Sequence, residues 1–454
     1  MRFKSYSILI AASLAISSCG KNFLDEKRDS KEVIVRTIAD YQAVMDNAAV
    51  VNNNASLIFN MVSAAEYYLA DKDVNTWKIN MPPEINAYLW EKEIYETRES
   101  FDWNNSYHRI MVANLALDVE KLSPVNAAEK TVADNTKGHA RFVRAYAFYQ
   151  LAQLFCKPYD AATAGSDLGV PIKLDYDVTV RMPNRSNVAA VYAQIIKDLE
   201  EALPLLPEKP QVVFRPGKTA VYTLLAKVYM QMGNWDKVLE YSNEALKIKS
   251  DLKDFKDFKA LPSMPTDYGK TLNEMFYYAQ SAKPSSTFTG MMVTPEVFDL
   301  YEADDYRKDA YFNATTKAFK GSFAGLYANF SGYTTSEVYL MRAEACARLN
   351  QTDKALADLN ELRKYRFPDT KPALAITDQT ELIKFVIDER RRELYQRGTR
   401  WEDLRRLNKE PQFAVTLTHT FEGRSYSLPP NDIRYTMPLP DNEIQLNNYP
   451  QNPR

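Results

Sequence analysis

Residues 336–363 read SEVYLMRAEACARLNQTDKALADLNELR, and this stretch decides the fold. Apolar and small residues recur every three or four positions on each side of the polar turn 350–353, which is the spacing of amphipathic helices. Asn and Asp in the turn suit the end of one helix and the start of the next. The residues in register are Tyr339, Ala343, Cys346, Ala355 and Leu359. The stretch therefore predicts two antiparallel helices joined by a short turn.

The same arrangement occurs earlier in the chain, around the turn Gly233-Asn234. Its residues in register are Tyr222, Leu225, Ala226, Tyr229 and Ala245, and a weaker echo comprises Arg141, Arg144, Ala145 and Phe148. The spacing resembles tetratricopeptide helix pairs, in which small residues let two helices approach closely. Generic helical hairpins, the alternative, also need small residues at their contacts. Because stacked helix pairs form curved scaffolds with a concave face, the repeat favours binding over catalysis.

Most of the remaining chain also has helical periodicity. Helices are expected over 36–70, 101–122, 138–156, 187–203, 217–232, 235–249, 335–350, 353–366, 378–397 and 400–408. Short strands are expected near 275–279 and 425–438. We predict an all-α fold, a tetratricopeptide-like helical-pair scaffold with irregular ligand-binding insertions. Its N-terminal region is expected at 19–269 and its C-terminal region at 270–454.

The first residues predict export and a lipid anchor. A basic start is followed by an apolar run over 8–16 and by Ser17-Ser18-Cys19, which is the pattern of a secretory signal peptide over residues 1–18. The run is shorter than the roughly 20 residues that a helix needs to span a bilayer. Ile16 to Cys19 also fits the bacterial lipobox, in which Cys19 is acylated and becomes the mature N-terminus. The alternative is an ordinary signal peptide in which the cysteine falls there by chance.

Charge and cysteine content narrow the function classes. Residues 1–18 contain two of the 57 basic residues and none of the 59 acidic ones, so the predicted mature chain has a net charge of −4. That balance lacks the basic face of a nucleic-acid-binding protein. Besides Cys19 the chain has only Cys156 and Cys346, so no disulfide framework is expected. Both lie in apolar helical patterns and are predicted to be small buried hydrophobes, although one bridge between them stays open.

Two charged motifs place opposite charges three and four positions apart on predicted helices, where they would meet along one face. The first comprises Glu389, Arg390, Arg392 and Glu393, and the second pairs Trp401 with Arg405 and Glu402 with Arg406. A glycosidase would need two carboxyl groups facing a cleft at a set separation. The helical spacing instead predicts structural ion pairs.

The sequence lacks the common catalytic and cofactor motifs. His108, His139 and His419 are scattered, with no two at the spacing of transition-metal ligands. A calcium-type site on carboxylates such as Asp71 and Asp73 is left open. No glycine-rich phosphate loop, no Gly-x-Ser-x-Gly and no cysteine–histidine pattern occurs, so we expect no cofactor.

Several motifs together resemble the SusD/RagB family. The central ones are residues 336–345 with 357–363, ERRREL at 389–394, GTRWEDLRR at 398–406 and PLPDNEI at 438–444, followed by Asn447 and 451–453. Upstream matches are 23–25 after the lipobox, 103–107 with Asn114, and 140–146. The likeness covers essentially the whole mature chain in the family's order. The stretches 71–99 and 277–330, where the family binds ligand, match no particular subfamily.

The resemblance implies a lipid-anchored protein of the outer membrane that faces the cell exterior and is not an enzyme. Such a protein captures a nutrient and passes it to a SusC-like TonB-dependent barrel. An oligosaccharide is the expected cargo, and a peptide, as in the RagB branch, is the alternative. A glycoside hydrolase on an α-helical scaffold is a third hypothesis, for which no catalytic constellation is found.

Two aromatic segments are the candidate ligand-binding regions. The segment 71–99 has poor helical periodicity and holds aromatic rings among Asn, Asp and Pro residues, and the segment 277–292 begins with two tyrosines. The candidate ligand-binding residues are Trp77, Tyr88, Trp90, Tyr277 and Tyr278. Loops on a rigid scaffold are where recognition usually occurs. The alternative is that these rings only pin the loops to the scaffold.

Overall fold

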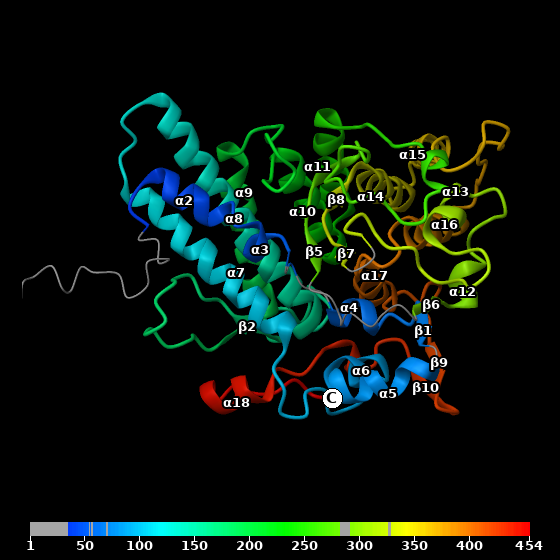
Figure 1. Cartoon of the computed structure of the whole chain (residues 1–454), viewed down its shortest axis with the longest axis horizontal. Coiled ribbons are helices and arrows are strands. Elements are labelled where there is room, and N and C mark those ends of the chain that lie inside the picture. The colour runs from blue at the N-terminus through cyan, green and yellow to red at the C-terminus, as the bar shows by residue number, and fades with distance from the viewer. Residues whose placement is uncertain (1–34, 54, 56–57, 70, 282–290, 326–327) are drawn as a thin grey trace, which may run out of the picture.

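The computed structural model describes residues 35–454 except 54, 56–57, 70, 282–290 and 326–327. Helices dominate the described chain, and its strands form short antiparallel pairs (Figure 1). This architecture confirms the predicted all-α fold. The predicted signal peptide and Cys19 lie outside the described residues.

The helices follow one another along the whole described chain. Up to residue 248 they are α2 (Ile38–Met45), α3 (Ala48–Val51), α4 (Ile58–Val62), α5 (Asp71–Asn80), α6 (Pro82–Tyr88), α7 (Phe101–Leu117), α8 (Ala127–Phe155), α9 (Val188–Ala202), α10 (Lys218–Gln231) and α11 (Trp235–Ile248). Beyond it they are α12 (Pro295–Phe298), α13 (Tyr306–Tyr311), α14 (Thr335–Arg348), α15 (Thr352–Arg363), α16 (Gln379–Glu393), α17 (Thr399–Leu407) and α18 (Asp441–Asn447). Short 3₁₀ turns are η2 (Asp118–Lys121), η3 (Leu203–Leu205), η4 (Phe255–Phe258) and η6 (Ile433–Tyr435).

The strands make five two-stranded antiparallel pairs in the described residues. Before residue 282 they are β1 (Tyr67–Leu69), β2 (Leu168–Pro171), β3 (Arg185–Asn187), β4 (Met275–Tyr277) and β5 (Gln280–Ser281). After it they are β6 (Met291–Val293), β7 (Asn329–Phe330), β8 (Tyr333–Thr334), β9 (Leu417–Phe421) and β10 (Arg424–Leu428). The pairs are β1–β6, β2–β3, β4–β8, β5–β7 and β9–β10. The β9–β10 pair is a hairpin, and β1–β6 joins the segment before α5 to the segment before α12.

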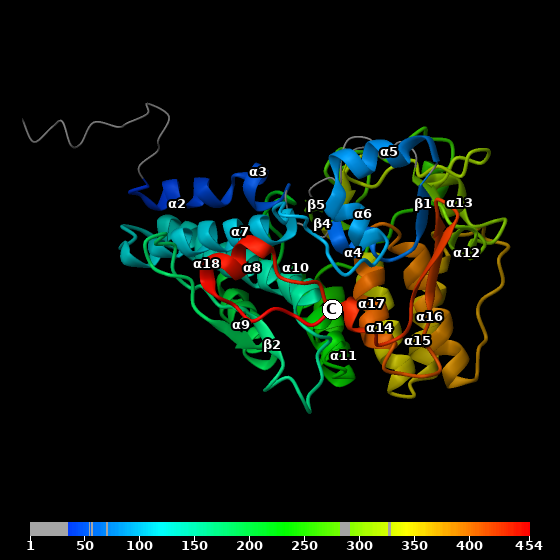
Figure 2. The same cartoon turned by 90° about the horizontal axis from the view of Figure 1, so that it is seen from below.

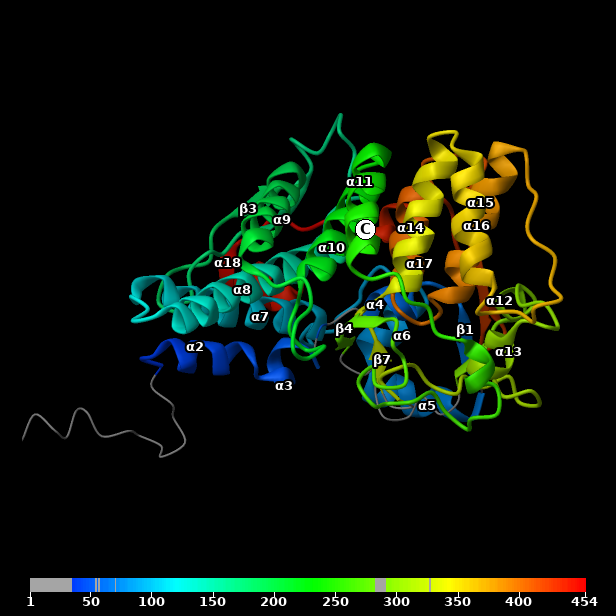
Figure 3. The same ribbon diagram turned by 90° about the horizontal axis from the view of Figure 1, so that it is seen from above.

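The two predicted helix pairs are present. Helix α10 packs against α11, α14 packs against α15, and α11 packs against α14, which joins the pairs into one stack. Figure 3 shows α11, α14, α15 and α16 side by side. Ala226 and Ala343 have no exposed surface, as the repeat register predicts. Gly233 (φ 72°) and Asn350 (φ 58°) adopt the left-handed conformation that ends a helix, so each predicted turn is also in place.

Two stretches differ from their predicted structure. The range 36–70 is not one helical run, because Asn52 donates side-chain hydrogen bonds to the carbonyls of Phe214 (3.0 Å) and Tyr278 (2.8 Å) and holds the chain between α3 and α4. The segment 71–99, expected to be irregular, contains α5 and α6. Its periodicity is weak because α6 is short and buries residues on several sides, with Pro82 at its first turn. Helices α4, α5 and α6 lie across one end of α14–α17 (Figure 2).

The two cysteines of the scaffold are buried and free, so the bridge that the sequence left open is not formed. Burial raises the pKa of Cys156 to about 12 and that of Cys346 to about 11. Both side chains therefore act as small apolar residues, as predicted.

The charged motifs form ion pairs, as predicted, but the pairs are buried and join different elements. Arg307, from α13, donates to Glu389 (2.6 Å) and Glu393 (2.9 Å) of α16. Arg366 donates to Glu393 (2.7 Å) and to Glu274 (3.1 Å), which precedes β4. All five side chains are fully buried. The arginines hold the pKa of Glu389 down at about 2 despite a burial that alone would raise it.

Helix α17 connects to three neighbours in the same way. Arg406 donates to Glu344 of α14 (2.6 Å) and to Asp403 (2.7 Å), and Asp403 also accepts from Arg390 of α16 (3.1 Å). Glu402 contacts Lys227 of α10 (3.3 Å) instead of pairing with Arg406, so that predicted pair is wrong.

The partner predicted for Trp401 is also wrong. Trp401 packs against Tyr435, with ring centroids 4.8 Å apart, and not against Arg405. Arg392 with Glu389 and Arg406 with Asp403 do pair along their own helices, as the spacing predicts, whereas the other pairs join neighbouring elements.

Asp403→Asn should destabilise the fold strongly. The substitution keeps the shape but leaves Arg390 and Arg406 buried with reduced compensation, and breaking a buried pair costs about 3–5 kcal/mol. Glu240→Gln, which removes an exposed pair with Lys237, is the matched control and should cost at most about 1 kcal/mol. Urea unfolding of the two variants measures the difference. Equal losses would contradict a structural role for the buried network.

Candidate ligand-binding site

The five predicted aromatic residues all lie in the interior, with 0–2% of their surface exposed. They are Trp77, Tyr88, Trp90, Tyr277 and Tyr278. The Trp90 indole N–H donates to the carbonyl of Ser63 (3.0 Å), and the Tyr277 ring meets Phe142 edge-on with centroids 4.9 Å apart. In this conformation the rings anchor the two segments to the scaffold, which was the alternative interpretation. That they contact ligand stays a prediction.

Two of these rings enclose a histidine from the β9–β10 hairpin. The His419 imidazole stacks on Tyr88 (centroids 4.2 Å apart, interplanar angle 16°) and on Trp90 (4.3 Å, 8°). Burial lowers the pKa of His419 to about 4, so its ring is neutral at neutral pH. An ion pair between Lys78 of α5 and Glu422 at the hairpin turn lies beside the stack. The segment 71–99 and the hairpin therefore form one packed unit, although they are more than 300 residues apart in sequence.

A small cavity of about 210 Å³ opens beside α6, and we call it the α6 cavity. It is lined by Ile58, Phe59, Asn80, Met81, Pro83, Glu84, Arg98, Glu99, Phe101 and Asp102. Phe101 begins α7 and is 59% exposed, in contrast to the buried rings nearby. An exposed ring beside amide, guanidinium and carboxyl groups can stack on the C–H face of a sugar while the polar groups bond its hydroxyls.

Two carboxyl groups in the α6 cavity have raised pKa values. Burial raises the pKa of Glu84 to about 7, and the neighbouring Asp102 charge adds to the effect. Burial likewise raises the pKa of Asp102 to about 6, although its oxygens accept the backbone N–H groups of Phe59 (2.9 Å) and Ile58 (3.0 Å). Asp102 thus caps the start of α4. Buried carboxyl groups with raised pKa values in a cavity are typical of functional sites.

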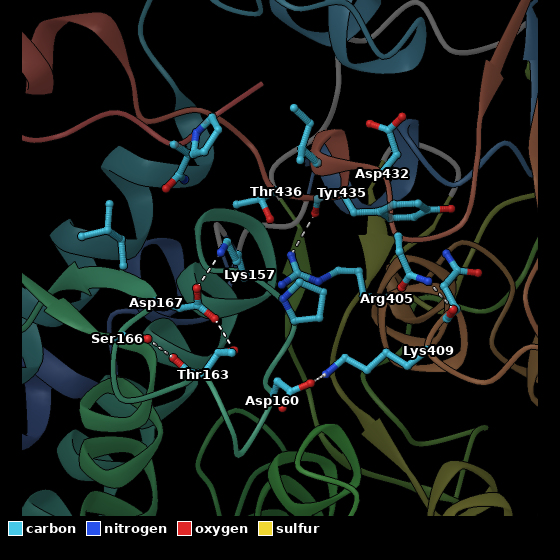
Figure 4. A pocket seen from close by; sticks show the side chains of 17 residues that line it. Lys157, Asp160, Thr163, Ser166, Asp167, Arg405, Lys409, Asp432, Tyr435 and Thr436 are labelled. Carbon is cyan, nitrogen blue, oxygen red and sulfur yellow. Dashed lines mark hydrogen bonds and ion pairs between the residues drawn. The ribbon is translucent and has the colours of Figure 1, made fainter.

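A larger cavity of about 450 Å³ lies between the C-terminal end of α8 and the end of α17, and we call it the α8–α17 cavity. Its lining includes Lys157, Pro158, Asp160, Thr163, Ser166, Asp167, Leu168, Arg405, Asn408, Lys409, Asn431, Asp432, Ile433, Tyr435, Thr436, Asn452 and Pro453. Figure 4 shows Thr163, Ser166 and Asp167 on one side and Arg405 and Lys409 on the other. Its volume falls in the range of about 300–1,000 Å³ that small-molecule sites occupy.

Arg405 forms the buried floor of the α8–α17 cavity. Its guanidinium donates to the carbonyls of Cys156 (2.6 Å), Tyr435 (3.1 Å) and Gln153. Two of these carbonyls belong to the last turn of α8, where the helix dipole is negative and a cation is stabilised. The Nε of Arg405 is buried and has no hydrogen-bond partner in the structure. The arginine therefore closes the C-terminal end of α8.

Neither cavity was identified from the sequence. Residues Glu84, Arg98 and Glu99 fall inside the predicted segment 71–99, but Phe101 lies just beyond it. A phenylalanine at a helix start carries no sequence signal that distinguishes an exposed ring from a core ring. The α8–α17 cavity combines four separate stretches, 157–168, 405–409, 431–436 and 452–453, which no local pattern could bring together.

The described residues contain neither a cluster of metal ligands nor a helix that could span a membrane. In the part of the chain that the structure describes, no group of three or more His, Cys, Asp or Glu side chains could hold a metal ion. The side chain of Asp71, proposed for a cation site, is outside what is described, and so is that of Asp73. Among the described helices, none combines the length and apolar character needed to cross a membrane.

The fold and its cavities define a binding protein built on stacked helix pairs. A family model described as starch-binding and associating with the outer membrane matches residues 22–230, and the SusD family model matches residues 325–454. The chain belongs to the SusD/RagB family, which confirms the resemblance seen in the sequence. Members of this family are binding proteins rather than enzymes and associate with the outer membrane.

Similar proteins agree with this assignment. SusD-like protein P2 of Formosa agariphila is 24% identical over 421 residues, which cover 77% of this chain and 79% of the relative. A SusD superfamily structure from Bacteroides thetaiotaomicron superposes with a TM-score of 0.74 at 19% identity, covering 92% of this chain and 100% of the other. Surface glycan-binding protein A from Bacteroides uniformis gives a TM-score of 0.70 at 17% identity, with 91% and 98% covered. These structures establish the common fold.

Glu84→Gln should stabilise the protein at neutral and alkaline pH but not at pH 4.5. Because the pKa of Glu84 is about 7 in the folded chain, against a usual 4.5, the folded state keeps its proton longer. The contribution of Glu84 to stability is therefore greatest below pH 4.5 and is lost as the pH rises from 4.5 through 7, by up to about 3 kcal/mol. Thermal melts at pH 4.5 and 8.5 should show the variant equal to wild type at the lower pH and higher-melting at the upper.

The exposed Glu240→Gln is the control for that comparison and should show no such pH-dependent gain. A Glu84→Gln variant that melts like wild type at both pH values would mean that Glu84 is solvated and has an ordinary pKa.

Proposed function

We propose that this protein captures an oligosaccharide at the cell surface and passes it to a SusC-like TonB-dependent outer-membrane transporter. The observation that carries the proposal is the match of SusD-type family models to both parts of the chain. One model is described as starch-binding, and a solved protein of the same fold is a surface glycan-binding protein. Because these descriptions name glycans, they favour a carbohydrate over a peptide as cargo.

The α6 cavity supports this proposal chemically. Phe101 offers an exposed ring face, and Asn80, Arg98 and Glu99 supply hydrogen-bonding groups around it. Such a mixture suits sugars, which combine apolar C–H faces with many hydroxyl groups. We assign the buried Trp77, Tyr88 and Trp90 a supporting role, holding this segment rigid against the scaffold.

The acidic groups of the signature motifs support binding rather than hydrolysis. Glu389 and Glu393 each bond arginine side chains in the interior, and so does Asp403. Carboxylates held in this way are poorly placed to donate or accept the proton that glycoside hydrolysis requires. These residues therefore support a receptor role.

The N-terminal motif supports attachment to the outer membrane through a lipid on Cys19. Cys19 precedes the first residue that the structure describes, residue 35, by 16 positions. Several acyl chains on one residue hold a protein firmly, whereas a single chain anchors it only marginally.

Phe101→Ala should weaken glycan binding and leave stability unchanged. A glycan array and a peptide library, both probed with the mature chain from Gly20 onward, identify the ligand, and calorimetric titration then measures affinity. Loss of a stacking ring should lower the affinity about tenfold or more. Trp90→Ala is the contrasting variant: its ring is 1% exposed, so its loss should cost about 3–5 kcal/mol of folding stability.

Binding to peptides without binding to any glycan would overturn the carbohydrate proposal. Glycan binding that is unchanged in Phe101→Ala would keep the carbohydrate proposal and remove the α6 cavity from it.

Cys19→Ala should abolish membrane attachment. Without the thiol there is no site for acylation, so the protein should appear in the soluble fraction or keep its uncut signal peptide. Fractionation of wild-type and Cys19→Ala cells, with an immunoblot of each fraction, measures this. Ser18→Ala keeps a small residue before the cysteine and should still be membrane-bound. Membrane association of Cys19→Ala protein whose signal peptide has been removed would contradict the lipid anchor.

A further inference from the structure

We infer that the α8–α17 cavity is a second saccharide-binding site, which takes a neutral mono- or disaccharide unit of the captured glycan. The inference rests on the proposed carbohydrate function and adds a site that is separate from the aromatic segments. The cavity is the larger of the two described above, and it is built from α8, the loop after it, α17 and the C-terminal segment.

The charge of the α8–α17 cavity indicates a neutral ligand. Three basic and three acidic side chains line it, so their formal charges cancel. The basic ones are Lys157, Arg405 and Lys409, and the acidic ones are Asp160, Asp167 and Asp432. A phosphate or polyanionic ligand would find no excess of positive charge here, and a cationic ligand no excess of negative charge. Uncharged polyols meet no such electrostatic penalty.

Donors and acceptors in the cavity are arranged in adjacent pairs. Lys157 lies 2.5 Å from Asp167, whose other oxygen accepts from Thr163 (2.6 Å), and Lys409 lies 3.4 Å from Asp160. Each sugar hydroxyl both donates and accepts, so neighbouring hydroxyls pair best with a donor and an acceptor that lie side by side. These paired groups therefore match the edge of a sugar ring.

Asp167 and Asp160 both have lowered pKa values, which suits them to accept hydrogen bonds from sugar hydroxyls. Burial raises the pKa of Asp167, but the hydrogen bonds from Lys157 and Thr163 outweigh it and lower the pKa overall. The backbone N–H of Ala162 and the Lys409 ammonium lower the pKa of Asp160. Both groups are carboxylates at neutral pH and accept hydrogen bonds.

The cavity also has apolar walls. Pro158, Leu168 and Ile433 line the same space and can contact the C–H groups of a sugar.

The cavity is connected to the predicted ligand segment 71–99 through η6. Ile433 and Tyr435 of this turn line the α8–α17 cavity. Arg434, between them, donates to the carbonyl of Trp90 (3.4 Å). Ile433 is 55% exposed.

Thiol protection at Ser166 tests the inference at the cavity itself. Ser166→Cys, in the mature chain from Gly20 onward, introduces an accessible thiol, because Cys156 and Cys346 are buried and have raised pKa values. The alkylation rate with iodoacetamide is measured with and without glucose, galactose, mannose, xylose, maltose, cellobiose or lactose. At least one of these sugars should slow alkylation about fivefold or more at saturation, because a bound ring covers the thiol.

Two controls define the outcome. Ser123→Cys places an exposed thiol outside either cavity, and its alkylation should be unaffected by sugar. Adding Lys409→Ala to Ser166→Cys should raise the sugar concentration for half protection about tenfold, since one donor–acceptor pair is lost. Lys364→Ala, an exposed lysine on α15, should leave it unchanged.

Absence of protection by every sugar overturns the inference, and so does protection by the dipeptide Ala-Ala instead of a sugar. The glycan array reports binding by the whole protein, so glycans that bind there without protecting the thiol would remove this cavity and leave the proposed function standing.

Discussion

The ion pairs between α17 and its neighbours are the interaction on which the rest of the structure depends. Arg406 bonds Glu344 of α14 and Asp403, which also bonds Arg390 of α16. Charges in a nonpolar interior cost several kcal/mol each unless they are paired with good geometry. Small rotations of α14, α16 or α17 would separate these atoms and leave buried charges unpaired, which would destabilise the fold. The network therefore specifies one packing of the three helices more strictly than apolar contacts of similar area could.

The sites follow from where this network holds α17. Arg405 of α17 donates to the Cys156 carbonyl at the C-terminal end of α8. Trp401 of the same helix packs on Tyr435 of η6. Asn452, near the chain end, then bonds the carbonyls of Phe155 (2.8 Å) and Met437 (2.8 Å). These contacts fix the walls of the α8–α17 cavity from three directions. The charged motif of α17, which could be mistaken for a catalytic or surface feature, therefore positions the residues that line the α8–α17 cavity.

The sequence predicted those parts of the fold that depend on neighbouring residues. Helix pairs, their turns and the buried Ala226 and Ala343 follow from three- and four-residue spacing and from the left-handed turn positions. The same spacing could not tell an exposed charged face from a buried network, because it says nothing about the partner element. Tyr88 and Trp90 looked available for ligand, since the residue that covers them, His419, is more than 300 positions away. Phe101, the exposed ring, carried no signal of its own.

Burial of the aromatic rings bears on how such a receptor binds and releases cargo. A ligand that had to order a loose loop would lose affinity to the entropy of ordering it, and rings already packed against the scaffold reduce that loss. Tight single-site binding would in turn oppose release to a transporter. Two modest sites avoid the conflict, because linked contacts retain a long chain strongly while each contact alone dissociates readily. On the proposed function, two cavities of moderate size would therefore suit a receptor that must also release its cargo.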